Sequence, residues 1–325
     1  MSEVVEEDGK VEIDKWQDMT KEEQEKLGNP KAKNGKAPLI IDSKCIYTPE
    51  QLTEQILINV KRNLVEFQQS IIPNNGDFCM VGSGVSVMDN IHAIKDCQDQ
   101  GMPIIAIKGA HDWLIENGII PDICIMLDPQ PKISNCIKHR GQWPVSHKGC
   151  IYMIASQCSP EIFEVLKDQR VVIWHALSNI GEAKLVPGRM LVGGGTTTGL
   201  RAFNIGFLMG FRRFRMFGFD SCLKDKKSMI KRMSGEKATK VIDVECGERV
   251  FPCNPAMAGQ ANELQSMIKM FDGNIRMKSY GYGLITEILR ERRRAKVYDW
   301  FDPDLESEFE DGIITSTNDL YPEDK

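Results

Sequence analysis

Two stretches rich in glycine and hydroxyl side chains follow apolar runs in this 325-residue sequence. The first reads Gly82-Ser83-Gly84-Val85-Ser86, and the second runs from Gly193 to Gly199 and includes three consecutive threonines. Glycine lets the backbone turn tightly and approach a ligand closely. A helix that follows such a turn offers unpaired N–H groups to an anion. The candidate nucleotide-binding residues are therefore Gly82, Ser83, Gly84, Ser86, Gly194, Gly195, Thr196, Thr197 and Thr198.

Neither stretch completes a known phosphate-binding motif. Val87 stands where the dinucleotide fingerprint has its third glycine. Gly194 to Gly199 has the spacing of a P-loop, but Leu200-Arg201 stand where Lys and Ser/Thr are required, which argues against a Walker ATPase. The alternative interpretation of the second stretch is a tight turn in which a threonine caps the next helix.

Two carboxylates end predicted strands. Asp128 closes the apolar run Pro121–Asp128, and Asp220 closes the strand after the second glycine-rich stretch. At the same sheet edge they could hold Mg²⁺ between phosphates, contact a ribose hydroxyl or act as a base. The alternative is that each caps the loop that follows it. We predict catalytic and metal-binding roles for Asp128 and Asp220, with Mg²⁺ as the cofactor.

Alternating strand and helix patterns surround these residues. Further strands are predicted over Asp77–Val81, Ile104–Lys108, Ile151–Ala155, Val171–Trp174 and Arg276–Tyr280. Helices are predicted over Val87–Gln100, His111–Asn117 and Pro255–Phe271, and Asp243–Phe251 is predicted to form a strand pair. The pattern favours an α/β, Rossmann-like, doubly wound and mostly parallel sheet with helices on both faces. In such sheets ligands bind outside the carboxyl ends of the strands, where the strand order reverses.

The domain organisation is read from composition. Residues 1–36 form a predicted flexible acidic tail, 37–76 an N-terminal helical segment, 77–298 the core and 299–325 an acidic C-terminal tail. The helical segment starts at Thr48 as N-cap, with Pro49 in the first turn, and its apolar residues recur at helical spacing as far as Phe67. A basic insertion at about 222–242 could close over an anionic ligand.

The overall composition argues against several classes of protein. A formal charge of -5 makes nucleic-acid binding unlikely, and no apolar run approaches a membrane span. The N-terminus lacks an apolar signal segment, and the ten cysteines are scattered singly, which favours a cytoplasmic location. The five histidines show no metal-ligand spacing.

Taken together, the ordered motifs GSGVS, NGIIPDICIMLDPQP, GGGTTTGLRAFNIGFLMGFRRFRMFGFD and MAGQANELQ resemble one family. It is the family named after the archaeal 6-hydroxymethylpterin diphosphokinase, which also contains motility-associated factors that glycosylate flagellin. Its fold is similar to that of sialyltransferases that use CMP-sugars. The resemblance covers about residues 50 to 290. It implies a transferase core that binds a nucleotide between the two turns, with Asp122 and Asp128 in one motif and Gly218 and Asp220 in another.

Two departures from the family pattern guide the choice of function. Val85 replaces a proline of the first turn, and no histidine follows His175, where the sialyltransferase-like members use one. The leading hypothesis is a nucleotide-dependent transferase that transfers diphosphate from ATP to a small-molecule acceptor. The alternatives are a glycosyltransferase that uses a nucleotide-activated sugar and a glycan acceptor, and a non-catalytic nucleotide-binding or scaffold protein. An oligomer is possible in each case.

Overall fold

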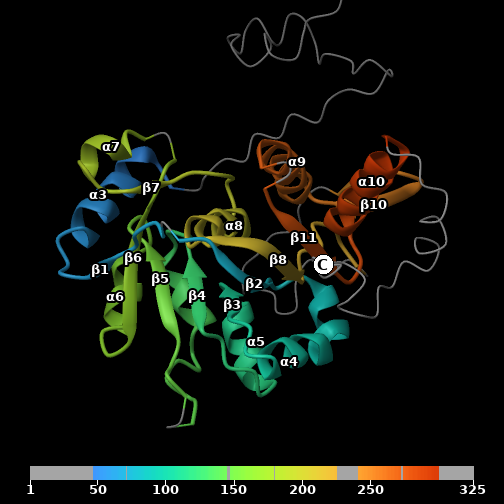
Figure 1. Cartoon of the computed structure of the whole chain (residues 1–325). Helices are drawn as coiled ribbons and strands as arrows, with labels where there is room; N and C mark the ends of the chain where they lie inside the picture. Colours follow the sequence, from blue (N-terminus) through green and yellow to red (C-terminus); the bar gives the residue numbers. More distant parts are fainter. Residues whose placement is uncertain are drawn as a thin grey trace, which may run out of the picture.

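The computed structural model describes residues 47–70, 72–144, 147–178, 180–224, 241–271 and 274–299. Within these residues the main element is a nine-stranded sheet in which every neighbouring pair is parallel (Figure 1). The strand order is β1-β6-β5-β4-β3-β2-β8-β11, and β7 pairs with β6. The predicted α/β fold is confirmed. The strands are β1 (Val65–Glu66), β2 (Asn74–Val81), β3 (Ile104–Ile107), β4 (Ile123–Met126), β5 (Ile151–Ala155), β6 (Arg170–Ala176), β7 (Leu191–Val192), β8 (Phe211–Phe217) and β11 (Arg276–Tyr280).

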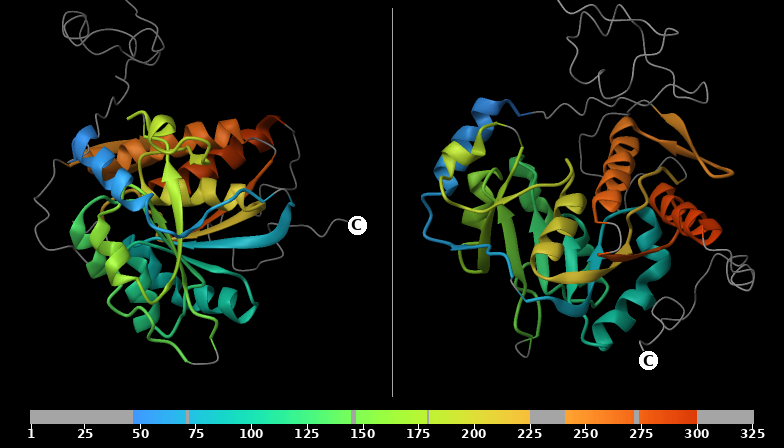
Figure 2. Two further views of the ribbon diagram at one scale, coloured as in Figure 1. Left: turned by 90° about the vertical axis from the view of Figure 1, so that its left-hand side faces the viewer. Right: turned by 45° about the horizontal axis from the view of Figure 1, so that its top comes forward.

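Helices cover both faces of the sheet, as predicted. The helices α4, α5 and α6 lie on one face, whereas α8, α9 and α10 lie on the other (Figure 2). A separate antiparallel hairpin, β9 (Ile242–Cys246) with β10 (Arg249–Cys253), corresponds to the strand pair predicted there. The helices are α3 (Pro49–Asn59), α4 (Ile91–Asp99), α5 (Ala110–Glu116), α6 (Pro160–Val165), α7 (Glu182–Leu185), α8 (Thr198–Leu208), α9 (Pro255–Met270) and α10 (Leu284–Asp299), with 3₁₀ helices η1 (Val85–Asn90) and η2 (Pro131–Cys136).

The strand order reverses between β2 and β8. From β2 the chain adds β3, β4, β5 and β6 outward on one side, and it then returns to place β8 and β11 on the other side of β2. The segments that follow β2 and β8 therefore leave the sheet in opposite directions. In open α/β sheets this switch point is the usual place for a ligand.

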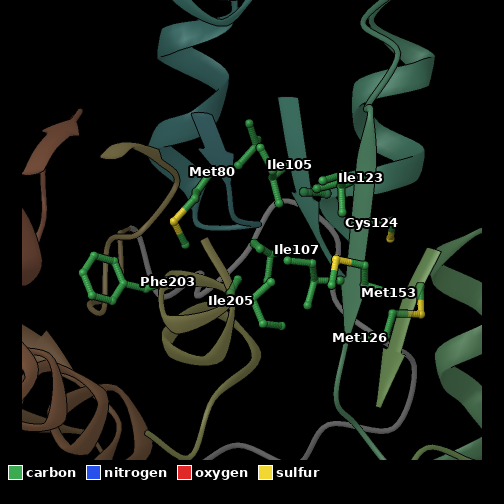
Figure 3. Close-up of a cluster of buried hydrophobic side chains, with 14 of the residues drawn as sticks. Met80, Ile105, Ile107, Ile123, Cys124, Met126, Met153, Phe203 and Ile205 are labelled. Atoms are coloured by element: carbon green, nitrogen blue, oxygen red, sulfur yellow. The ribbon is translucent and has the colours of Figure 1, made fainter. Parts of the chain in front are cut away.

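The core lies between the sheet and the helices on each face. Phe78, Met80 and Trp174 are among the side chains with almost no exposed surface. Figure 3 shows residues of the central strands and of α8, including Phe203 and Ile205, gathered in one apolar cluster. Strands that are apolar on both faces are typical of a parallel sheet covered by helices on both sides. The sheet in turn fixes the positions of the strand ends.

The N-terminal part of the described chain differs from the prediction. Helix α3 has the predicted Thr48 cap with its capping box, but it ends at Asn59, and Leu57 is 41% exposed rather than buried. The next residues form β1 instead of more helix. Strand β2 begins at Asn74 rather than at Asp77, and the Asn74 side chain accepts a hydrogen bond from the Gly76 N–H within an irregular register.

The helix predicted over Val87–Gln100 is two elements, the 3₁₀ helix η1 and then α4. The side-chain amide of Asn90 donates to the carbonyl oxygen of Ser86 at 2.8 Å. That oxygen is the acceptor that the Asn90 N–H would use in an α-helix, so the side chain competes with the regular bond.

Several predictions fall on residues outside the described ranges. They concern the predicted acidic tails, the first residues of the segment 37–76 and most of the basic insertion, of which Lys224 is described. Among the described residues, no helix is long and apolar enough to span a membrane.

Candidate nucleotide site at the strand ends

The first glycine-rich turn packs directly on the segment that follows β8. Gly82 donates its N–H to Phe217 O at 2.7 Å, and Gly84 donates to Gly218 O at 2.9 Å. A Cβ atom at Gly84 would lie 2.5 Å from Gly218 O and 2.8 Å from the Asp220 carboxylate. Only glycine permits this approach, so the glycines here bring two backbone segments together at the switch point.

Asp220 holds the first turn in place. One carboxylate oxygen accepts the Ser86 N–H at 2.9 Å, and the other accepts the Ser86 hydroxyl in a short hydrogen bond. The residue is 4% exposed. Burial raises the pKa of the Asp220 carboxyl above its ordinary value, and the two hydrogen bonds from Ser86 oppose that shift. The buried Asp220 side chain thus connects the segment after β8 to the first turn by hydrogen bonds.

The second turn forms the start of α8. Thr197 is the N-cap, and its hydroxyl oxygen accepts from the Leu200 N–H, as the alternative interpretation predicted. The Thr197 oxygen also accepts from the Gln260 side chain at 3.2 Å. Its neighbour Thr196 donates its N–H and its hydroxyl to one oxygen of Glu263, at 2.9 and 3.0 Å. Helix α9 therefore contacts the second turn through Gln260 and Glu263.

The structure brings both turns to one place. The Phe219 ring lies between them, since a Cβ atom at Gly82 or at Gly199 would be 3.4 or 2.8 Å from it. Gln260 joins the second turn to the end of β8, because its oxygen accepts from the Ser221 hydroxyl at 3.0 Å. Nucleotide binding by these turns remains a prediction, but their common location is a feature of the fold.

Strained backbone also gathers at this edge. Within the described residues, the non-glycine residues with positive φ are Lys108 (49°), which follows β3, and Ser221 (48°), which follows β8. Such conformations cost of order 1–3 kcal/mol each and cluster at ligand-binding sites. Both strands neighbour β2, so the strained residues flank the first turn.

Asp128 lies at the same edge but apart from Asp220. Its carboxylate pairs with Lys108 Nζ at 2.7 Å and accepts the Gln130 N–H at 3.1 Å. Because β3 and β2 separate β4 from β8, the two strand ends are about 14 Å apart at ordinary strand spacing. Asp122 lies at the amino end of β4, where it accepts the Ile104 N–H, away from this site.

The predicted Mg²⁺ does not fit these carboxylates in the present arrangement. Both oxygens of Asp220 accept from Ser86, and Asp128 is paired with Lys108. No group of three or more His, Cys, Asp or Glu side chains in the described part of the chain could hold a metal ion. Magnesium binding by Asp128 and Asp220 stays a prediction.

Sequence reasoning did not single out several residues of this edge. Gln260 and Glu263 stand three apart in MAGQANELQ, a spacing that places both on one helix face. Lys108 directly follows β3, and Ser83 and Asp220 likewise lie just beyond β2 and β8. A position just after a predicted strand could therefore have marked Lys108 as a candidate site residue. His111, by contrast, is fully buried between Asp112 and Tyr152, so it belongs to the core.

Comparison with known families agrees with the motifs. Residues 51–226 match the model of a family described as MptE-like, 6-hydroxymethylpterin diphosphokinase MptE-like. The chain belongs to this family. The matched region contains both glycine-rich turns, Asp128 and Asp220. The predicted resemblance is confirmed, and membership supports a transferase-like function.

A solved structure shares the fold. The MAf glycosyltransferase from Magnetospirillum magneticum AMB-1 is 19% identical, with a TM-score of 0.59. The similarity covers 77% of this chain and 41% of that chain, so this protein spans less than half of that enzyme's length. At this identity the likeness concerns the fold alone. No curated protein matches the sequence.

Proposed function

We propose that this protein is a nucleotide-dependent transferase that transfers diphosphate from ATP to the hydroxymethyl group of a pterin. The observation that carries the proposal is the meeting of two glycine-rich turns at the β2/β8 switch point, in a chain of the diphosphokinase-like family. The donor nucleotide would lie across the carboxyl ends of β2 and β8, between the two turns.

The transfer needs positioning and charge neutralisation more than a covalent intermediate. The acceptor hydroxyl oxygen attacks the β-phosphorus of ATP. The bond between that phosphorus and the α,β-bridging oxygen breaks, so AMP leaves, and the hydroxyl proton passes to solvent. Lys108 follows β3, the neighbour of β2, and it would supply a positive charge where the incoming phosphates replace Asp128, its present partner at 2.7 Å. Lys224, 3.4 Å from Asp89 Oδ2, supplies a second.

Glycosyl transfer from a nucleotide-activated sugar is the second candidate. It is favoured by the fold shared with the MAf glycosyltransferase. It is disfavoured by the sequence, which has no histidine after His175 to serve as a base. Diphosphate transfer has no comparable requirement, and it therefore ranks first.

The experiment has a binding step and a turnover step. Melting temperatures are measured with ATP, CTP, CMP and GDP at millimolar concentration, since a specific ligand stabilises the folded state by mass action. ATP is then incubated with 6-hydroxymethylpterin, and AMP is quantified. We expect a selective shift with ATP and pterin-dependent AMP release. A selective shift with CMP or GDP and no AMP would favour glycosyl transfer, and no shift would favour a non-catalytic scaffold.

Lys108 provides the variant for this test. Lys108→Met should lower kcat/KM for ATP by about 10- to 100-fold, because a hydrogen bond from a charged group contributes about 1.5–3 kcal/mol. Lys95→Met is the matched control, since Lys95 is exposed on α4 and outside the site. Equal activity of the two variants would remove Lys108 from the proposed site.

A further inference from the structure

The second turn already holds a carboxylate. One Glu263 oxygen accepts both the N–H and the hydroxyl of Thr196, the residue just before the N-cap of α8. A phosphate bound at the start of α8 would use these donors and the positive end of the helix dipole. Glu263 thus occupies the place that the sequence assigned to a phosphate.

The surrounding charges do not favour a second anion there. Like charges at a protein surface repel one another more strongly than in bulk water, so a phosphate beside Glu263 meets strong repulsion. Arg201, in the first turns of α8, is the buried cation nearest along the chain. Its guanidinium donates to Val192 O and to Leu177 O at the ends of β7 and β6. Two of its nitrogens are therefore occupied by backbone oxygens, whereas its buried Nε has no hydrogen-bond partner among the described residues. Burial lowers the pKa of Arg201 and the charge of Glu263 opposes that shift, so Glu263 already offsets this cation.

A carboxylate in this position suits hydroxyl donors instead. A carboxylate offers about four acceptor sites, and Thr196 uses one oxygen of Glu263. In dinucleotide-binding α/β folds an acidic side chain accepts hydrogen bonds from the ribose. A vicinal diol has two donors at a spacing that one carboxylate can accept. Gln260, one helical turn before Glu263, fixes α9 against both Thr197 and Ser221 and so sets the position of the carboxylate.

We infer that Glu263 recognises the ribose hydroxyls of the nucleotide, and that the phosphates point toward the ends of β2 and β3, where Lys108 lies. This inference rests on the proposed function, because it assigns the direction in which a bound nucleotide lies. It replaces the expectation that both glycine-rich turns bind phosphate groups. One turn, with α9, binds the sugar, and the opposite side of the site binds the phosphates.

The test compares ATP with 2′,3′-dideoxy-ATP, which lacks both ribose hydroxyls, by calorimetric titration of the full chain. For the wild type, removal of the hydroxyls should weaken binding by about 10- to 100-fold, because charge-assisted hydrogen bonds are lost. Glu263→Gln should weaken ATP binding by a similar factor and leave dideoxy-ATP within about twofold of its wild-type value, since these effects are not additive for groups in contact.

Two further arms separate recognition from a structural role. Thr196→Val removes the hydroxyl that donates a hydrogen bond to Glu263 but keeps the Glu263 carboxylate. It should change the affinities for ATP and dideoxy-ATP by the same factor. Inorganic tripolyphosphate should bind Glu263→Gln as it binds the wild type and should bind Lys108→Met more weakly.

Each contrary result is distinct. Tighter ATP binding by Glu263→Gln would mean that the carboxylate blocks a phosphate site, and equal losses for both nucleotides would make Glu263 a positioning residue. Either result overturns the inference and leaves the proposed function standing. Equal binding of ATP and dideoxy-ATP to the wild type does the same. No binding of either nucleotide to the wild type overturns the proposed function, and the inference with it.

Discussion

At the scale of single residues, Asp220 shows how a side chain at a candidate site can stabilise the backbone around it. Its carboxylate is buried, and both oxygens accept hydrogen bonds from Ser86. Its place at a strand end predicts catalysis or metal binding, which stays a prediction, and its contacts make it also the support of the first turn. Replacement of Asp220 therefore tests the stability of the turn before it tests chemistry.

The pH dependence of stability reports on this carboxyl. Burial raises its folded-state pKa above the unfolded value, near 3.9. The folded protein therefore binds more protons in the pH window just above that value, and its contribution to stability is lost as pH rises toward the folded-state pKa. Asp220→Asn should remove this loss, because the amide keeps the shape but does not titrate.

Urea unfolding between pH 4 and 8 measures the effect. The free energy of unfolding of Asp220→Asn should fall less over this range than that of the wild type. Asp220→Ala is the contrasting variant, and it should lose about 1–3 kcal/mol, because it leaves the buried Ser86 donors without an acceptor. Identical pH profiles for wild type and Asp220→Asn would contradict the raised pKa.

At the scale of elements, α8 sets the second turn because it packs closely on the sheet. A Cβ atom at Gly206 would lie 2.8 Å from the Phe78 ring and 2.9 Å from the Phe214 ring. Alanine is usually better than glycine within a helix, by about 1 kcal/mol. Here the overlap with two rings should dominate, since overpacking costs about 1–3 kcal/mol. Gly206→Ala should therefore destabilise the protein.

Chemical denaturation of the wild type, the two single variants Gly206→Ala and Phe78→Leu, and the double variant checks this sign. Phe78→Leu provides space next to residue 206, so Gly206→Ala should cost less in the Phe78→Leu background than in the wild type. A stabilising Gly206→Ala substitution, as expected for an exposed helix position, would show that α8 does not pack on the sheet in this way.

The elements themselves were largely readable from the sequence. Buried parallel strands are continuously apolar, and Ile151–Ala155 begins and ends as predicted. Arg276–Tyr280 also has the predicted bounds, although it is a mixed polar and apolar strand at the edge of the sheet. The 3₁₀ start of the helix after β2 was missed, because it depends on one Asn90 side-chain bond rather than on periodicity. The sequence could not predict the partners of Thr196 and Asp128. Their contacts with Glu263 and Lys108 depend on the strand order and on the position of α9, which are tertiary features.

At the scale of the whole molecule, the parallel sheet separates two edges with different roles. The carboxyl edge carries both glycine-rich turns, the strained residues Lys108 and Ser221, and the α9 contacts. The amino edge is held by ion pairs, in which Asp77 of β2 pairs with Arg213 and accepts a hydrogen bond from Arg215 of β8. This polarity follows from a sheet in which every strand points the same way, and it predicts where a ligand should act.

Amide hydrogen exchange with and without ATP tests that polarity. Binding at the switch point should slow exchange in Gly82–Ser86 and Gly193–Thr198, because bound ligand suppresses the local opening that exposes their N–H groups. Segments at the amino edge, such as Asn74–Gly76 and Gly101–Met102, serve as internal controls and should exchange at unchanged rates. Protection confined to the amino edge would place the ligand on the opposite side of the sheet from both glycine-rich turns, Lys108 and Glu263. Protection of the first turn alone would instead mean that α8 and α9 do not contact the ligand, because a nucleotide that spans the site must slow exchange at both turns.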